Sequence, residues 1–331
     1  MIKNTQVILK STPEGEPNVS NFAFTESDIP TLNDKQVLCK TLYLSLDPYM
    51  RSQIAGRHIS GSIKPGDVLH GETVSEVIES LDEHYKVGDK VRCMGGWQKY
   101  SLHSAKDLNK ISEHINPSSY ALSVLGMPGL TAYAGLVWQA KPKAGDVVVI
   151  SAATGAVGSM AGQLAKIYGC KVIGIAGSDA KCAYAKEQLG YDECINRRTE
   201  DIANRLDELC PKGVDIYFDL VGGEILNTVS ARLAIGARVI LCGLMAEYNQ
   251  KERIGGPPPG FWIRSRAKIY GLVVYDFEHR RQEFIDVCLP LINNGSLKMR
   301  EDIAQGIAAA PEAFCRLMKG ANMGKALVKV S

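Results

Sequence analysis

The strongest chemical signal in the sequence is a short turn, SAATGAVG, at residues 151–158. The turn follows an apolar segment typical of a buried strand and opens a segment typical of a helix, the setting of a dinucleotide-binding turn. Gly155 would let the backbone approach a pyrophosphate and Gly158 would let the helix pack closely, although Ala153 stands where the usual G-x-G-x-x-G pattern begins. The N-terminus of such a helix offers N–H groups and partial positive charge to phosphates. The predicted contacts are Thr154, Gly155, Ala156, Val157 and Gly158.

The residues after the next two predicted strands indicate which nucleotide would bind. An NAD enzyme usually has a carboxylate at the tip of the second strand for the ribose 2′-hydroxyl, but this strand ends in Gly177-Ser178. Asp179 follows and could be that carboxylate, but Ser178 and Asp179 are also typical of a helix N-cap, and this is the role that we favour for Asp179. Lys181 lies in the first turn of that helix, where a cation opposes the helix dipole unless a 2′-phosphate is nearby. Arg197-Arg198, after the third strand, either form a solvated basic pair or add charge that favours NADPH over NADH.

Possible metal ligands are poorly arranged for zinc catalysis. His70-Gly71-Glu72 contains the nearest approach to a liganding pair, and no cysteine stands in a matching position. We therefore predict no metal site. Without a Lewis acid to polarise a carbonyl, a dehydrogenase is better suited to delivering hydride to a conjugated alkene, because there the carbonyl needs only a hydrogen bond as the enolate forms.

The composition excludes several other classes of protein. The chain has 331 residues, 45% apolar and 22% charged, as in a globular protein of about two domains. Its 38 basic and 36 acidic residues give a net charge of +2, which provides no reason to expect a nucleic-acid partner. There is no apolar run long enough for a membrane span and no signal-peptide pattern at the start, so we expect a cytoplasmic protein. Nine cysteines without a C-x-x-C pair are expected to be reduced thiols.

The elements that must position the turn fall into three zones. Residues 1–125 have the pattern of strands and turns, which predicts an antiparallel, barrel-like domain. Residues 126–290 alternate short apolar strands with helices, which predicts a doubly wound parallel sheet of the α/β class. Residues 291–331 end in a strand pattern and are expected to return to the first domain. The principal expected elements are strands at Gln36–Leu46, Asp146–Ser151, Lys171–Ala176, Val214–Leu220, Ala237–Cys242, Lys268–Tyr275 and Ala326–Val330, and helices at Val157–Tyr168 and Asp179–Leu189.

Several separate motifs, in order along the chain, resemble one known family. They are residues 42–51 (LYLSLDPYMR), 126–133 (GMPGLTAY), the turn at 152–158, Cys242-Gly243 with Tyr248-Asn249, and 320–325 (GANMGK). Together they are similar to the zinc-free leukotriene B4 12-hydroxydehydrogenase/prostaglandin reductase family of the medium-chain dehydrogenase/reductase superfamily, and especially to its bacterial curcumin reductase branch.

The resemblance implies a Rossmann domain, a GroES-like domain that carries the substrate, and a homodimer. It implies NADPH-dependent reduction of the carbon–carbon double bond of α,β-unsaturated ketones or aldehydes, with hydride transfer to the β-carbon. It places the 2′-phosphate on Lys181 and a hydrogen bond from Tyr248 to the substrate carbonyl, with Tyr49 as a second active-site candidate. Besides the turn, the implied cofactor contacts are Gly177, Ser178, Lys181, Arg197, Leu220, Cys242, Gly243, Tyr248, Leu272, Val273, Val274 and Asn322.

The two tyrosines and two departures from the family pattern leave alternatives open. A neutral phenol, with an ordinary pKa of about 10, can donate to a developing enolate without carrying charge. Packing is the alternative role for Tyr248 and for Tyr49. Arg197 stands where the family commonly has a tyrosine, and it can still stack or pair with phosphate. Leu220 replaces a common asparagine and can line the cofactor only through its backbone.

Two other functions are compatible with the same cofactor prediction. An NADPH quinone oxidoreductase would differ in its acceptor, and competing assays with quinones and enones separate it from an enone reductase. A non-catalytic NADPH-binding protein would bind the nucleotide without turnover of any acceptor.

Overall fold

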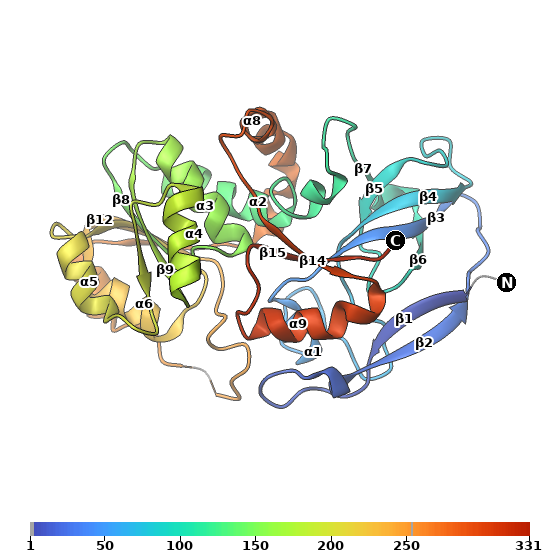
Figure 1. Ribbon diagram of the computed structural model, residues 1–331, viewed down its shortest axis with the longest axis horizontal. Helices are drawn as coiled ribbons and strands as arrows, with labels where there is room; N and C mark the ends of the chain where they lie inside the picture. The colour runs from blue at the N-terminus through green and yellow to red at the C-terminus, as the bar shows by residue number, and fades with distance from the viewer. Residues whose placement is uncertain (1–2, 253) are drawn as a thin grey trace. The chain divides into compact units, whose positions relative to one another are not determined.

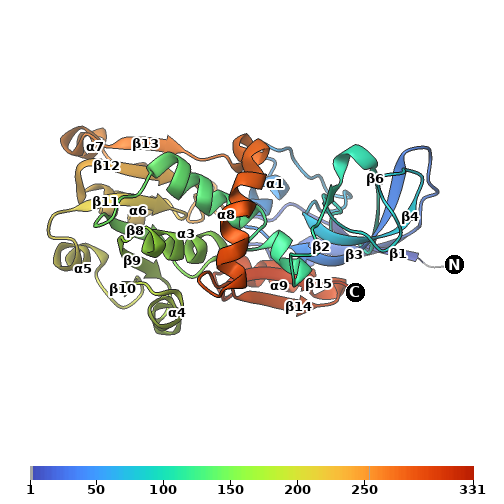
Figure 2. The same cartoon turned by 90° about the horizontal axis from the view of Figure 1, so that it is seen from above.

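The middle of the chain forms a parallel six-stranded sheet, whose short strands alternate with helices in the sequence (Figure 2). The computed structural model describes residues 3–252 and 254–331. The strands lie side by side in the order β10 (Glu193–Asn196), β9 (Lys171–Ala176), β8 (Val147–Ser151), β11 (Val214–Asp219), β12 (Leu233–Leu241) and β13 (Lys268–Gly271). The order reverses between β8 and β11, as in a doubly wound Rossmann sheet, which confirms the predicted fold class.

Helices connect the strands of this sheet. They are α3 (Ala156–Ile167), α4 (Asp179–Leu189), α5 (Ile202–Leu209), α6 (Gly223–Ser230) and α7 (Pro259–Ser265), with α2 (Met127–Tyr133) before the sheet and α8 (Arg281–Asn293) after it. Apolar side chains pack between the helices and the strands, and Val149, Ile173 and Tyr217 are completely buried there. Burial of one large side chain contributes about 1.5–3 kcal/mol, so this core gives the strand ends a rigid support.

A second sheet is built from the two ends of the chain. Its strands follow the order β14 (Glu301–Gln305), β15 (Lys325–Lys329), β3 (Gln36–Ser45), β4 (Thr73–Ser80), β5 (Lys90–Cys93) and β7 (Asn109–Lys110), and β6 (Tyr100–Ser104) also pairs with β3. Figure 1 shows the C-terminal strands, in red, beside the blue strand β3. Strands β1 (Lys3–Leu9) and β2 (Phe22–Asp28) form a separate antiparallel pair.

One pair in the second sheet departs from the antiparallel arrangement that the sequence predicted. Strands β14 and β15 are parallel, whereas the other pairs are antiparallel. The helix α9 (Ala310–Met318) lies between these two strands in the sequence. Parallel neighbours need such a crossover connection, because a tight hairpin reverses the chain direction.

The contacts within the chain divide it into two units. The first contains the residues up to Ser123 together with Glu301–Ser331, and the second contains Val124–Arg300. The sequence placed the return to the first domain at residue 291, but residues 291–300 pack with the second unit. Gln163 on α3 holds this segment, because its side-chain amide donates to the Lys298 carbonyl at 2.8 Å and accepts from the Lys298 N–H at 2.8 Å.

None of the helices in residues 3–252 and 254–331 has the length and apolar character needed to cross a bilayer. Within the same ranges, no group of three or more His, Cys, Asp or Glu side chains is arranged to hold a metal ion. All nine cysteines are free thiols, and all of them except Cys242 are buried.

Candidate functional site

The glycine turn lies at the carboxyl end of β8, directly before α3. Gly155 is the N-cap of α3 and has an extended backbone. No side chain in the described part of the chain caps this helix end, so the N–H groups of its first turn can face an anion. A Cβ atom on Gly158 would collide with the Ala152 carbonyl, and one on Gly155 would lie 3.2 Å from the same oxygen. Gly158 therefore excludes any side chain, and Gly155 leaves little room for one.

The missing first glycine of the turn is explained by the neighbouring strand. Ala153 is completely buried, and a Cβ on Gly174 of β9 would lie only 2.7 Å from the Ala153 Cβ. Glycine on β9 thus provides the space that the Ala153 methyl group occupies. Tyr191 fixes the turn from the same side, since its hydroxyl donates to the Gly158 carbonyl at 2.8 Å and to the Ala153 carbonyl at 3.3 Å. Ala152 adopts a left-handed conformation with φ 48°, a cost of about 1–2 kcal/mol for an L-residue.

Two arginine side chains flank the backbone after β9, and Lys181 follows in the first turn of α4. We call Lys181, Arg197 and Arg198 the basic cluster. A Cβ on Gly177 would lie 3.7 Å from Arg197 Nε and 3.9 Å from Arg198 Nε, so both guanidinium groups flank this glycine. Both arginines are exposed, and neither forms an ion pair in the part of the chain that the structure describes. The cluster has the charge and exposure that a phosphate monoester requires.

The N-cap of α4 differs from the sequence prediction. Ser178, not Asp179, occupies that position with an extended backbone, and its hydroxyl accepts from the Lys181 N–H at 3.3 Å. Asp179 is the first residue of the helix, and its carboxylate accepts a hydrogen bond from the Asn196 side chain at 2.6 Å. The two candidates are adjacent in sequence, and Ser178 is the cap because its backbone is extended and the helix begins at Asp179.

A buried carboxylate that the sequence analysis did not identify holds the end of β11. Asp219 is completely buried and accepts hydrogen bonds from the hydroxyls of Tyr217 (2.7 Å) and Ser151 (3.0 Å). It also accepts from the N–H groups of Val221 (3.1 Å) and Gly222 (3.0 Å). Burial raises the pKa of Asp219, and these hydrogen bonds oppose the rise. The only sequence signal was a carboxylate at the end of an apolar strand.

Tyr248 lies against the backbone that follows β12. Its hydroxyl oxygen accepts from the Leu244 N–H at 3.4 Å, and a Cβ on Gly243 would lie 3.6 Å from that oxygen. Burial raises the pKa of Tyr248 above its ordinary value, although the bond from Leu244 lowers it in part. Cys242 keeps part of its surface exposed, but removal of its thiol from water raises the pKa of Cys242 to about 12. Both side chains are therefore neutral at physiological pH.

The segment after β13 was wrongly expected to continue as a strand to Tyr275. Strand β13 ends at Gly271, because its partner in the sheet ends at Leu241, which is paired with Gly271. Leu272 is buried and donates its N–H to the Leu241 carbonyl at 2.9 Å. Val273 is 37% exposed, and Val274 begins a 3-10 helix, Val274–Arg280.

Most of the predicted cofactor contacts lie at one edge of the parallel sheet. The carboxyl ends of parallel strands share an edge, and this edge is where ligands bind in doubly wound sheets. Leu220 is buried there, and its N–H donates to the Ser151 hydroxyl at 2.8 Å. The contacts that follow the strand ends are Thr154, Gly155, Ala156, Val157, Gly158, Gly177, Ser178, Lys181, Arg197, Leu220, Cys242, Gly243, Tyr248, Leu272, Val273 and Val274.

Two predicted site residues belong to the first unit instead. Tyr49 is the N-cap of α1 (Met50–Ile54), and its ring centre lies 5.0 Å from that of His58 at an interplanar angle of 33°. Asn322 lies in the loop between α9 and β15, where its side-chain nitrogen donates to the Gly324 carbonyl at 2.8 Å.

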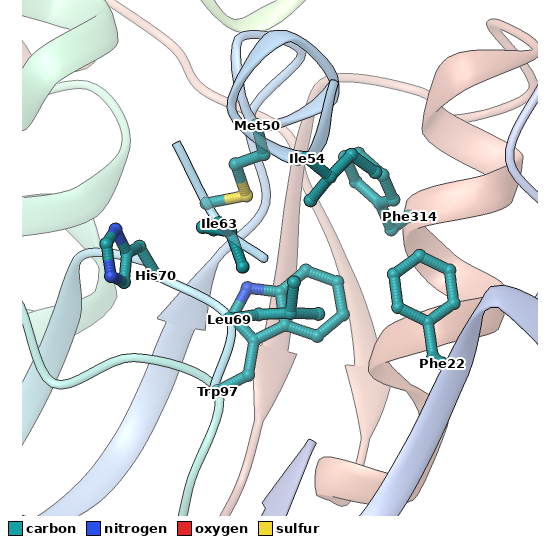
Figure 3. Close-up of a pocket in the computed structure, with 8 residues that line it drawn as sticks. All are labelled: Phe22, Met50, Ile54, Ile63, Leu69, His70, Trp97 and Phe314. Carbon is teal, nitrogen blue, oxygen red and sulfur yellow. The ribbon is translucent and has the colours of Figure 1, made fainter. Parts of the chain in front are cut away.

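A small apolar pocket opens beside α1 (Figure 3). Met50 and Ile54 reach into it from that helix, opposite the indole ring of Trp97. Phe22 stacks on Trp97 at 5.9 Å between ring centres, and Phe314 meets it edge-on at 5.7 Å. The Trp97 indole N–H is buried and has no hydrogen-bond partner among the described residues. The helix that follows Tyr49 therefore packs, through Met50 and Ile54, against a cluster of aromatic side chains.

The chain is similar to known oxidoreductases over nearly its whole length. A family model described as "N-terminal domain of oxidoreductase" matches residues 5–111, and one described as "Zinc-binding dehydrogenase" matches residues 156–292. The NADPH-dependent curcumin reductase of Escherichia coli (strain K12) is 40% identical over 336 residues, which cover 99% of this chain and 97% of that protein. Prostaglandin reductase 1 of Bos taurus is 38% identical over 327 residues, which cover 97% of each chain.

A solved structure extends the likeness to three dimensions. The crystal structure of CurA in complex with NADPH, from Vibrio vulnificus, matches with a TM-score of 0.94 and 40% sequence identity. The match covers 99% of both chains, so it includes the glycine turn, the basic cluster and the C-terminal strands together.

Proposed function

Because this chain belongs to the zinc-free leukotriene B4 12-hydroxydehydrogenase/prostaglandin reductase family of the medium-chain dehydrogenases/reductases, we propose that it uses NADPH to reduce the carbon–carbon double bond of α,β-unsaturated ketones and aldehydes. The similar curcumin reductase is named as NADPH-dependent, and the similar CurA structure contains NADPH. Both similarities extend over nearly the whole chain.

The basic cluster around Gly177 is the observation that carries the proposal. A 2′-phosphate has two negative charges, and two guanidinium groups flank the glycine at the tip of β9 where an NAD enzyme would place a carboxylate. Charge-assisted hydrogen bonds to phosphate are among the strongest that side chains form. The uncapped N-terminus of α3, next to the side-chain-free surface of Gly155 and Gly158, suits the pyrophosphate. The residues present therefore fit NADPH.

Tyr248 is the proposed hydrogen-bond donor in the reaction. NADPH, when bound, would supply the hydride that adds to the β-carbon. The residues of the site would then stabilise the negative charge that develops on the carbonyl oxygen. Burial keeps the Tyr248 phenol neutral, so it donates its proton into a hydrogen bond rather than repelling the enolate. The Leu244 N–H donates to the same phenol oxygen, which polarises the O–H group further. A proton from solvent then adds to the α-carbon, so that the hydride and the proton together saturate the double bond.

We assign the substrate side of the reaction to the turn that carries Tyr49. Its half-buried ring presents an apolar face, held in place by the His58 ring. Conjugated ketones and aldehydes are flat and mostly apolar, so an aromatic face suits them. Tyr49 is then a binding residue that orients the double bond.

The proposal is tested by assaying the purified protein with NADPH against curcumin, a 15-oxo-prostaglandin and a series of alkenals. We expect NADPH oxidation coupled to a product that has gained two hydrogens at the carbon–carbon double bond, identified by mass spectrometry and NMR. Inactivity with all these enones would contradict the proposal. Turnover of quinones alone would indicate a quinone reductase, and NADPH binding without any turnover would indicate a non-catalytic role.

The resemblance supports two further assignments. We propose that the protein is a homodimer and that it acts in the cytoplasm. Light scattering of the protein as it elutes from a sizing column should give twice the mass of one chain, and a monomeric mass would contradict the first assignment. Fractionation of the cells that make the protein tests the second.

A further inference from the structure

A lysine side chain is completely enclosed within the first unit. Lys325, the first residue of β15, is 1% exposed, and its ammonium group donates to Asp47 Oδ1 at 2.5 Å and to the Leu46 carbonyl at 2.8 Å. The Asp47 side chain is 7% exposed, and its other oxygen accepts a hydrogen bond from the Ser45 hydroxyl. Each charge therefore has a counter-charge and further hydrogen bonds in the protein interior.

Stability alone does not account for this ion pair. Removing two charges from water costs free energy that their mutual attraction often fails to recover, and apolar side chains of similar volume commonly stabilise a core as well or better. Some ion pairs of the same unit keep a side chain in water, as Lys110 does opposite Asp89, with 55% of its side chain exposed. The pair of Arg92 with Glu72 is largely buried, but its side chains keep 11% and 14% exposure, against 1% for Lys325. A buried ion pair can instead fix the relative position of the two segments that carry it, because each charge must keep its partner within hydrogen-bonding distance.

The two partners belong to the two segments of the first unit that carry predicted site residues. Asp47 begins the turn to Tyr49, and its carbonyl accepts the Met50 N–H at 3.1 Å. Lys325 directly follows the loop that contains Asn322. The segments also meet through their backbones, since the Leu46 N–H donates to the Ala326 carbonyl at 3.2 Å. The ion pair therefore fixes the start of one segment against the end of the other.

The loop before Lys325 is held at a second point. Asp302 of β14 accepts the Met323 N–H at 3.2 Å. The Asn322 side-chain nitrogen donates to the Gly324 carbonyl, which orients its amide group. With Lys325 fixed at one end and Met323 at the other, the short segment that carries Asn322 has little freedom to move.

We propose that the buried ion pair between Lys325 and Asp47 positions Tyr49 and Asn322 relative to each other for the reaction. Lys325 and Asp47 are positioning residues, because they act through the turn and the loop and not on the substrate. The inference rests on the proposed function for its catalytic consequence. Its structural consequence, the order of the turn at Tyr49, is measurable without any substrate.

The test is a double variant, Asp47→Asn with Lys325→Met, which removes both charges and nearly preserves the volume. A single change would leave one buried charge unpaired and is expected to destabilise the fold, so it is less informative. The matched control is Val77→Ala, a cavity in the separate apolar cluster formed with Val37 and Val91. The control lowers stability without touching the turn or the loop.

We expect the double variant to fold with a melting temperature at or above that of the Val77→Ala control, yet to have a kcat for enone reduction about tenfold or more below that of the wild type. Amide hydrogen exchange at Met50, Arg51 and Ser52 should become about tenfold faster in the double variant and stay unchanged in the control. Normal kcat together with normal exchange in the double variant would overturn the inference.

The outcomes separate this inference from the proposed function. If the wild-type chain reduces no enone, the proposed function fails, and the exchange rates still test whether the ion pair orders the turn. If the double variant does not fold, the variant Ser45→Ala is tested instead. It removes only the hydrogen bond from the Ser45 hydroxyl to Asp47. For Ser45→Ala we expect a smaller loss of kcat, about threefold, with faster amide exchange at Met50. If neither kcat nor the exchange rate changes, the ion pair does not position the turn.

Discussion

At the residue scale, the proposed mechanism requires Tyr248 to be protonated. Burial raises its pKa, so the neutral form, which can donate a hydrogen bond, persists up to and beyond the ordinary value of about 10. We expect kcat/KM to show no decline from ionisation of Tyr248 below about pH 10. In Tyr248→Phe, kcat should fall by about 100-fold with KM little changed, since a donor to a developing oxyanion has typically this effect. A pH–rate profile with a Tyr248-dependent decline near neutral pH would contradict the role.

The basic cluster gives a second prediction at this scale. Lys181→Ala should raise the Kd for NADPH about 10- to 100-fold, because a charge-assisted hydrogen bond to the 2′-phosphate contributes about 1.5–3 kcal/mol. The Kd for NADH should change less than about twofold, because NADH has no 2′-phosphate for Lys181 to contact. Lys186→Ala is a matched control on the same helix. Lys186 is exposed, and its ammonium group lies 3.5 Å from the Glu193 carboxylate and not in the basic cluster. Equal losses for both nucleotides, measured by fluorescence titration, would remove Lys181 from the 2′ site.

At the element scale, the junction of β8 and α3 depends on the absence of a side chain at Gly158. An alanine there would press its methyl group against the Ala152 carbonyl, and such overpacking costs about 1–3 kcal/mol. We expect Gly158→Ala to lower the melting temperature and to weaken NADPH binding at least about tenfold by shifting the start of α3. Gly260→Ala, with no atom within 4 Å of the new Cβ, is the control and should do neither. Calorimetry gives both readouts, and unchanged binding in Gly158→Ala would exclude the turn as the phosphate site.

Some elements were predictable from sequence because their boundaries are set locally. Strand β9 and helix α4 have the predicted limits, since Gly177-Ser178 separates them and Gly190 ends the helix in a left-handed conformation with φ 73°. The end of β13 was not predictable, because it depends on where its neighbour β12 ends in the sheet. A run of apolar residues such as Lys268–Tyr275 fits a strand and a helix equally well.

Some features of the candidate site could be identified in the sequence and others could not. The glycine turn and the basic residues after β9 and β10 are contiguous in sequence and carry their own signal. The Asp219 network was not accessible, because Ser151 and Asp219 come from two strands that are neighbours only in the folded sheet. The pairing of Lys325 with Asp47 joins opposite ends of the chain, and a lone lysine in a strand pattern gives no indication of burial.

At the scale of the whole molecule, one chain builds its two units from three segments. The first unit is assembled from both ends of the chain, since β15 pairs with β3 in an antiparallel register. Tyr49 and Asn322 are therefore on one unit, while the glycine turn, the basic cluster and Tyr248 are on the other. A reaction that requires all of them requires the complete chain, so we expect neither unit expressed alone to reduce an enone.

In the proposed reaction, hydride from NADPH reaches the β-carbon of a conjugated carbonyl compound. The most direct measurement uses NADPH carrying deuterium at the transferred position of C4, with a simple enone as acceptor and NMR of the product. We expect a saturated ketone with one deuterium on the β-carbon and a solvent-derived proton on the α-carbon. Deuterium on the carbonyl carbon of an allylic alcohol, or none in any reduced product, would contradict it.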